Sequence, residues 1–144
     1  MVKSNNSKQL ARLLILWLLP PLLLANHVHW LGDYDSALKL AQKDDKPLLV
    51  LVVKKSDISS SKIIQSSFMN QPYIDIVNDR MIAVIVTYEG RLSYPIEMYY
   101  TIVFPAFFLV DAKSEIFLKE PLYGKQLVPK TLLRYFQSCL PNAK

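Results

Sequence analysis

The sequence has 144 residues, enough for one domain with one hydrophobic core, and carries a formal charge of +5. Most of that charge lies near the start: without Lys3, Lys8 and Arg12 the 17 basic side chains fall to 14 against 12 acidic ones, a net +2. A nearly neutral remainder with scattered charges lacks the basic patch that nucleic-acid binding requires, so we expect no nucleic-acid partner.

Residues 1–25 have the layout of a secretory signal peptide. A basic start is followed by residues 13–25, which carry no charge. Export signals combine a positive start, an apolar stretch of about 7–15 residues and a small residue before the cleavage point, so we predict cleavage after Ala25. The alternative is an uncleaved membrane anchor, although a Pro-Pro pair interrupts the stretch and a span usually needs about 20 apolar residues. We expect one domain over residues 26–144, periplasmic or secreted, with membrane contact only if the leader is retained.

Two elements are predicted after the leader. Residues 27–31 are expected to form a short first strand. Its two histidines have no nearby ligating partners in the sequence, so we expect no bound metal. A helix is predicted next from apolar side chains at i, i+3, i+4 and i+7 spacing: Tyr34, Ala37, Leu38 and Ala41. Asp33 or Asp35 can cap this helix.

The apolar run from Leu48 to Val53 is predicted to be the central strand. Six apolar residues between a charged turn and a serine cluster are typical of a strand buried on both faces. The loop that follows leads into a helix, because apolar side chains recur at helical spacing after it. Open α/β sheets carry their sites at the carboxyl ends of strands. The loop is therefore the candidate site: Ser56, Asp57, Ile58, Ser59, Ser60 and Ser61.

The candidate N-caps of that helix are Ser59, Ser60 and Ser61, since a serine hydroxyl can accept from the free amides of the first turn, and Asp57 beside these serines resembles a cap more than part of a catalytic pair. Pro72 should end or kink the helix, because proline lacks the amide hydrogen and crowds the preceding turn. Residues 81–86 then form an aliphatic strand, expected to run parallel to the central strand because a long helical crossover separates them.

Residues 87–100 are predicted to be a polar loop with a short helix. This segment contains three tyrosines, Tyr94, Tyr99 and Tyr100. Such aromatic side chains can line a ligand surface, because tyrosine combines a flat apolar body with a polar tip. The commoner alternative is that they pack against their neighbours.

The remaining sequence predicts a second group of elements. Residues 102–111 form a strand, followed by a turn at residues 111–114 and a hairpin partner strand at residues 115–119. A closing helix covers residues 128–136. The single cysteine, Cys139, cannot form a disulfide within the chain, so we expect an inert thiol at a helix end; an intermolecular disulfide is the alternative.

These elements resemble those of the thioredoxin-like fold over about residues 28–138. The resemblance begins with Trp30, a helix and Lys46-Pro47 before an aliphatic strand, and it ends with Phe104-Pro105 opening a later strand and Gly124 in a loop. It implies the order β-α-β-α-β-α-β-β-α, a three-layer α/β/α sandwich with a mixed central sheet, and a cis peptide bond before Pro105.

The sequence departs from this family at the redox loop, which normally holds a Cys-x-x-Cys pair. Asp57-Ile58-Ser59-Ser60 occupies the aligned positions. Thiol–disulfide exchange needs a thiolate and a second sulfur, and serine supplies neither. A serine nucleophile would need a base within reach, and the two histidines lie in the first strand. We therefore expect no catalytic residue and no cofactor.

The expected function is an exported, redox-inactive adaptor or chaperone that binds a protein or peptide partner in the cell envelope. The resemblance implies a groove between the loop and Pro105, with these candidate lining residues: Phe104, Pro105, Tyr94, Tyr99 and Tyr100. Backbone groups beside the proline can pair with an extended chain. The alternative is a degenerate thiol–disulfide oxidoreductase, or a regulatory component of an envelope redox or protein-maturation system.

Overall fold

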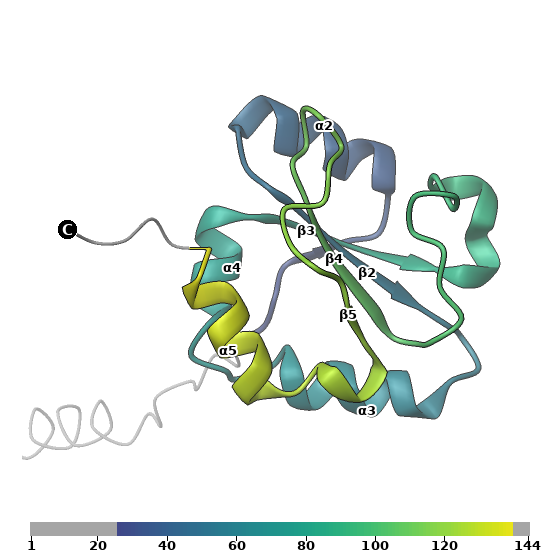
Figure 1. The fold of residues 1–144 in the computed structure, drawn as a ribbon, viewed down its shortest axis with the longest axis vertical. Coiled ribbons are helices and arrows are strands. Elements are labelled where there is room, and N and C mark those ends of the chain that lie inside the picture. Colours follow the sequence, from purple (N-terminus) through teal and green to yellow (C-terminus); the bar gives the residue numbers. More distant parts are fainter. Residues whose placement is uncertain (1–25, 140–144) are drawn as a thin grey trace, which may run out of the picture.

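The computed structural model describes residues 26–139, which form one mixed sheet between layers of helices. The five strands found in that range have the order β1-β3-β2-β4-β5 (Figure 1). β3 is parallel to β1 and β2, whereas β4 is antiparallel to both β2 and β5. Their bounds are Trp30–Leu31 for β1, Leu48–Val53 for β2, Ile82–Thr87 for β3, Ala106–Val110 for β4 and Leu122–Tyr123 for β5.

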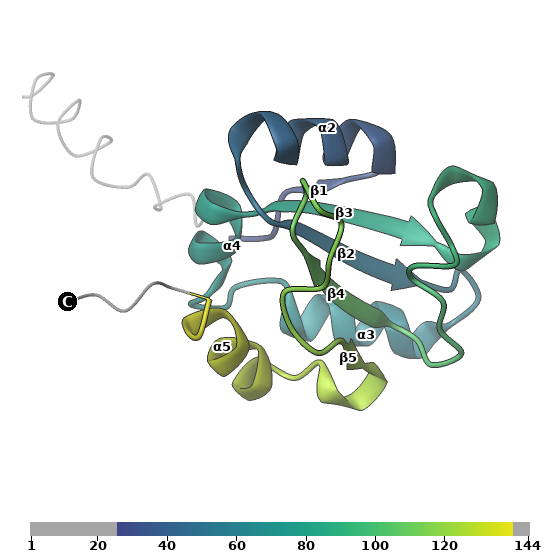
Figure 2. The ribbon, with the colours of Figure 1, turned by 45° about the horizontal axis from the view of Figure 1, so that its top comes forward.

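Helices cover both faces of this sheet. In Figure 2, α2 lies on one side of the strands, and α3 and α5 lie on the other. The helices are α2 Tyr34–Asp44, α3 Ile58–Ser67, α4 Ile74–Arg80 and α5 Pro129–Gln137, with 3-10 turns η1 Tyr88–Ser93 and η2 Gly124–Gln126. The arrangement confirms the predicted thioredoxin-like three-layer sandwich. No helix among the described residues is long and apolar enough to cross a bilayer.

β2 is the centre of the core, as the sequence predicted. Its six residues are 0–8% exposed, and they alternate between two apolar clusters. Leu49, Leu51 and Val53 pack with side chains of α3, α4 and α5. Leu48, Val50 and Val52 pack against α2 and against the β4 side chains on the same face of the sheet. A strand that is buried on both faces needs an unbroken apolar run, which is why no polar residue interrupts this one.

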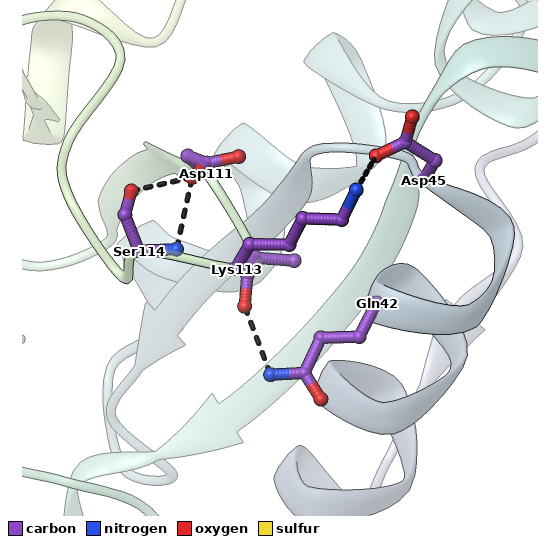
Figure 3. A network of polar contacts seen from close by, with 6 residues as sticks. Gln42, Asp45, Asp111, Lys113 and Ser114 are labelled. Atoms are coloured by element: carbon purple, nitrogen blue, oxygen red, sulfur yellow. Dashed lines mark hydrogen bonds and ion pairs between the residues drawn. The ribbon is translucent and has the colours of Figure 1, made fainter.

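Capping residues define the ends of α2. Asp33 is its N-cap and accepts a hydrogen bond from the Ser36 amide at 2.8 Å. At the other end Asp45 adopts the left-handed conformation with φ 53° and pairs with Lys113 at 2.6 Å. Figure 3 shows this ion pair beside the bond from Gln42 to the carbonyl of Ala112. These contacts attach α2 to the turn after β4.

Two sequence predictions about strands are wrong in detail. The first strand begins only at Trp30, and His27 forms an isolated bridge with Met69 instead. Residues 115–119 do not form a hairpin strand: Glu115 has φ 55°, and the segment makes a single isolated bridge between Val110 and Phe117. The left-handed residue ends the extended geometry that a regular strand requires. The strand that pairs with β4 is β5.

Candidate functional site

The loop after β2 is closed by Asp57, which caps α3. Its Oδ1 accepts from the Ser59 amide at 3.0 Å, and its Oδ2 accepts from the Ser60 hydroxyl at 2.6 Å. The prediction that Ser59, Ser60 or Ser61 would be the N-cap is therefore wrong. All three serines lie inside the helix, whereas Asp57 has the extended backbone that an N-cap needs.

Asp57 and Ser60 occupy the positions that the resemblance aligns with the two cysteines. Ser60 is only 2% exposed, and its hydroxyl is used by the Asp57 carboxylate. The hydrogen bond from Ser60 lowers the pKa of Asp57, and the Ser59 and Ser60 amides add to this effect. The positive end of α3, which would favour a thiolate, is thus already occupied by a carboxylate of the same helix.

The described residues bring no histidine to this loop. Ser56 and Ser61 are exposed, and Ile58 points largely into solvent with 73% exposure. The two histidines precede β1, whereas the loop follows the carboxyl end of β2 in a sheet where β1, β2 and β3 run parallel. The histidines and the loop therefore lie at opposite ends of the strands. No group of three or more His, Cys, Asp or Glu side chains in residues 26–139 is placed to hold a metal ion.

The start of β4 lies beside this loop. Val52 pairs with Ala106, so Pro105 lies next to the end of β2, and the Phe104–Pro105 peptide bond is cis. Phe104 forms no hydrogen bond through its backbone N–H or C=O within the described part of the chain. Both groups are therefore available to an outside partner.

A buried threonine holds the residues before Phe104 in place. The Thr101 hydroxyl donates to the Val103 carbonyl at 2.8 Å and accepts from the Val103 amide at 3.0 Å. On the far side, the Gly124 amide donates to the Pro105 carbonyl at 2.8 Å. Gly124 has φ 49°, and a Cβ there would lie 3.1 Å from a methyl group of Val103. Only glycine combines this backbone conformation with so close an approach.

Two of the three tyrosines assigned to the groove do not line it. Tyr94 and Tyr99 are 6% and 1% exposed, and the Tyr99 hydroxyl lies 2.9 Å from that of Tyr34. Tyr99 also packs edge-on against Phe108, with ring centroids 5.2 Å apart. Burial raises the pKa of Tyr99. The alternative reading, packing against neighbours, is correct for this pair; only Tyr100, at 65% exposure, faces solvent.

Sequence reasoning missed the apolar side chains that do lie at this surface. Ile102 is 79% exposed and Val103 is 48% exposed, because β4 begins only at Ala106 and leaves them outside the sheet. They border a shallow hollow of about 250 Å³ whose lining is Tyr100, Thr101, Ile102, Val103 and Tyr123. We call this hollow, together with Phe104, the β4 groove. The strand predicted for residues 102–111 therefore starts four residues late, directly after Pro105, and this proline was the signal in the sequence.

η1 packs against Phe104 of the β4 groove. The Tyr88 ring lies edge-on to Phe104 with centroids 5.2 Å apart, and Arg91 lies over Tyr88 at 5.6 Å. Glu89 accepts hydrogen bonds at 3.2 Å from the Lys55 amide through both carboxylate oxygens. These contacts join η1 to the loop after β2 and to Phe104. The loop, η1 and the chain before β4 therefore lie next to one another.

The protein has a thioredoxin-like fold, and the loop after β2 contains no cysteine. Two solved structures match with a TM-score of 0.64: a thioredoxin from Thermus thermophilus, 18% identical and covering 81% of this chain and 91% of its own, and the DsbH oxidoreductase, 14% identical and covering 79% and 85%. The oxidised C-terminal domain of Neisseria meningitidis DsbD matches with a TM-score of 0.50 and 24% identity, covering 74% and 97%. No family model and no curated protein sequence matches the chain. At these identities the likeness shows the fold.

Proposed function

We propose that this protein is an exported, redox-inactive member of the thioredoxin-like fold class that binds an extended segment of another polypeptide in the β4 groove. The observation that carries the proposal is the unpaired backbone of Phe104 beside the exposed side chains of Ile102 and Val103. An extended chain can pair with such backbone groups while its alternate side chains enter neighbouring pockets.

The chemistry of the groove indicates an apolar segment as the partner. The side chains around the hollow are aromatic or aliphatic except for Thr101, whose hydroxyl is already used by Val103. Ile58 adds a further exposed apolar side chain from the first residue of α3. A charged side chain in this hollow would lose hydration without gaining a counter-charge, so an uncharged, extended stretch is the better ligand.

Redox inactivity and export are parts of the same proposal. Asp57 and Ser60 can form neither a mixed disulfide nor its resolving bond, and Cys139 lies beyond the end of α5. Export is supported by the pattern of residues 1–25, which lie outside the described part of the structure. Mass spectrometry of the N-terminus of the mature protein tests it, and a first residue of Asn26 is the expected result.

The decisive experiment measures binding of an unfolded, cysteine-free polypeptide by fluorescence anisotropy. Val103→Asp should weaken binding by about tenfold or more, because it places a carboxylate at the edge of the hollow and tenfold corresponds to 1.4 kcal/mol. Val128→Asp is the matched control, since Val128 is similarly exposed, 42% against 48%, but lies at the start of α5. Equal loss in both variants, or none in Val103→Asp, would refute the proposal.

The second candidate is a degenerate oxidoreductase or a regulatory component of a thiol-redox system, favoured by the structural likeness to thioredoxin and the DsbH oxidoreductase. An insulin-reduction assay separates the two. Turnover comparable with that of a thioredoxin would refute redox inactivity, and its absence would refute an autonomous oxidoreductase. A purely regulatory role would still require binding to a redox partner through the β4 groove.

A further inference from the structure

A second exposed apolar surface lies on the sheet edge, away from the β4 groove. Residues 116–118, the edge segment, follow the turn after β4 and lie alongside the end of that strand. The Asp111 amide donates to the Ile116 carbonyl at 2.9 Å, and the Leu118 amide donates to the Leu109 carbonyl at 2.8 Å. In Figure 1 the chain between β4 and β5 passes in front of the sheet, and no helix covers it.

The edge segment presents both backbone and side-chain groups to solvent. Because backbone groups alternate between the two sides of an extended chain, those of Phe117 point away from β4. They form no hydrogen bond among the described residues. Ile116 is 65% exposed and Leu118 is 49% exposed, whereas the Phe117 ring packs 5.5 Å from that of Phe108. Proteins normally block such an edge, because an open apolar one pairs with another chain.

Opposite charges flank the edge segment, and neither has an ionic partner in the part of the chain that the structure describes. Glu115 is exposed and forms no ion pair. Lys119 is half-buried; its ammonium group donates to the Tyr135 carbonyl at 2.8 Å and to the Ser138 hydroxyl, and it lies 4.7 Å from the Tyr135 ring centre. All of these partners are neutral, so the ammonium charge stays uncompensated and one of its three N–H groups remains free.

We propose that the edge segment pairs with the same segment of a second copy of this chain, antiparallel and with Phe117 on the two-fold axis. The sequence Glu-Ile-Phe-Leu-Lys at 115–119 is complementary to itself in this register. Phe117 faces its own copy and exchanges two backbone hydrogen bonds with it. Ile116 faces Leu118 of the second copy, whereas Glu115 and Lys119 lie just outside the three paired residues and meet only through their side chains.

The self-complementarity is what selects a second copy over an unrelated peptide. A two-fold axis uses the same patch on both partners, so each apolar contact and each charge pair forms twice. The left-handed Glu115 limits regular pairing to three residues per chain. The interface is therefore small, and interfaces below about 1,200 Å² are typically weak or transient. We expect a monomer–dimer equilibrium that depends on protein concentration.

Cross-linking tests the register. In a Cys139→Ser background, Phe117→Cys should form an intermolecular disulfide under mild oxidation, because residues facing each other in a hydrogen-bonded pair have Cα atoms about 5.5 Å apart. Ile116→Cys is the control: its own copy is a diagonal neighbour at about 7–8 Å, beyond disulfide reach. Equal cross-linking of the two variants, or none of Phe117→Cys while circular dichroism shows it folded, would refute the pairing.

Charge reversal tests the partner without altering Phe117. Sedimentation velocity of the full chain, from micromolar to millimolar concentration, should show dimerisation that is weakened by Glu115→Lys. In the double variant Glu115→Lys with Lys119→Glu, which circular dichroism should show to be folded without the Lys119 bonds to Tyr135 and Ser138, dimerisation should be restored because the swap re-forms both pairs across the axis. A monomer at every concentration, or a dimer insensitive to these charges, would overturn the proposal. Binding of polypeptide in the β4 groove should stay unchanged in the double variant.

Discussion

The loop after β2 and the chain before β4 lie side by side at the same end of the sheet, yet they differ in what they leave open. In the first, the Asp57 carboxylate uses the Ser59 amide and the Ser60 hydroxyl. In the second, Thr101 uses both backbone groups of Val103, and Phe104 keeps its own unpaired. The polar groups of the first segment are therefore bonded within their own chain, whereas the apolar surface beside them remains exposed.

β2 and β4 hold these two segments next to each other. Val50→Asp, which disrupts the central strand, should therefore have the largest effect. Val50 is fully buried between Val84 and Phe108. An unpaired carboxylate there should cost several kcal/mol of a total stability of about 5–15 kcal/mol. We expect no soluble folded protein by circular dichroism and thermal melting. A normal melting curve would contradict the central position of β2; Val128→Asp, on the surface, should stay folded.

The next prediction concerns cysteines introduced into the loop after β2. Asp57→Cys with Ser60→Cys, in a Cys139→Ser background, should form an internal disulfide, because the two native side chains already point at each other with 2.6 Å between their oxygens. Mass spectrometry after mild oxidation should show the loss of two hydrogens.

The control for this prediction shifts the pair by one residue. Ser56→Cys with Ser59→Cys has the same spacing, but Ser56 precedes the cap and Ser59 is exposed on the helix. We expect a much lower yield of internal disulfide from this pair. Equal yields would mean that the loop is too mobile for the Asp57 cap to define its geometry.

Removing the hydrogen bonds that hold the chain before β4 should have a smaller effect. Thr101→Val removes both hydrogen bonds to Val103 and should cost about 1 kcal/mol in the free energy of unfolding, since exposed Val103 can partly exchange them for water. The Val103 amide should exchange hydrogen faster, and polypeptide binding should weaken. Thr101→Ser keeps the hydroxyl and should resemble the parent protein. Unchanged exchange in Thr101→Val would show that Thr101 does not position this segment.

The smallest expected effect is on the stability of the protein at acidic pH. The pKa of Asp57 is lowered from 3.8, chiefly by the Ser60 hydrogen bond. A lowered folded-state pKa contributes stability above pH 3.8 that is lost as the pH falls through the folded-state pKa. Asp57→Asn keeps a capping oxygen but does not titrate, so its melting temperature should fall less steeply below pH 4. Identical acid profiles would mean that the carboxylate contributes no measurable stability.

Apolar pattern and spacing predicted most of the fold. The run from Leu48 to Val53 indicated a strand buried on both faces, and the spacing from Tyr34 to Ala41 indicated a helix; both elements are present. The predicted break between α3 and α4 is present, but α3 ends at Ser67, five residues before Pro72, so the proline lies in the connecting segment and does not itself end the helix. These are local properties of the chain, because they depend on residues close together in sequence.

The site was predicted less completely. The sequence identified the loop at residues 56–61 and the absence of sulfur, but several neighbouring oxygens could have capped α3, and backbone geometry selected Asp57. It also placed three tyrosines at one surface, where packing against Tyr34 and Phe108 buries Tyr99. An aromatic side chain fits a core and a binding surface equally well, so its pattern alone does not separate the two.

By itself, therefore, the sequence determined the order of the elements, the central strand and the absence of cysteine from the loop after β2, since each depends on residue type and near-neighbour spacing. Only the tertiary structure decided which backbone groups of the described residues are left without a hydrogen-bond partner. Phe104 is left unpaired because Thr101 bonds to Val103 and β4 starts late, and Phe117 is left unpaired because its backbone groups point away from β4. Whether a backbone group is paired depends on where distant segments lie, and that is settled only when the sheet has formed.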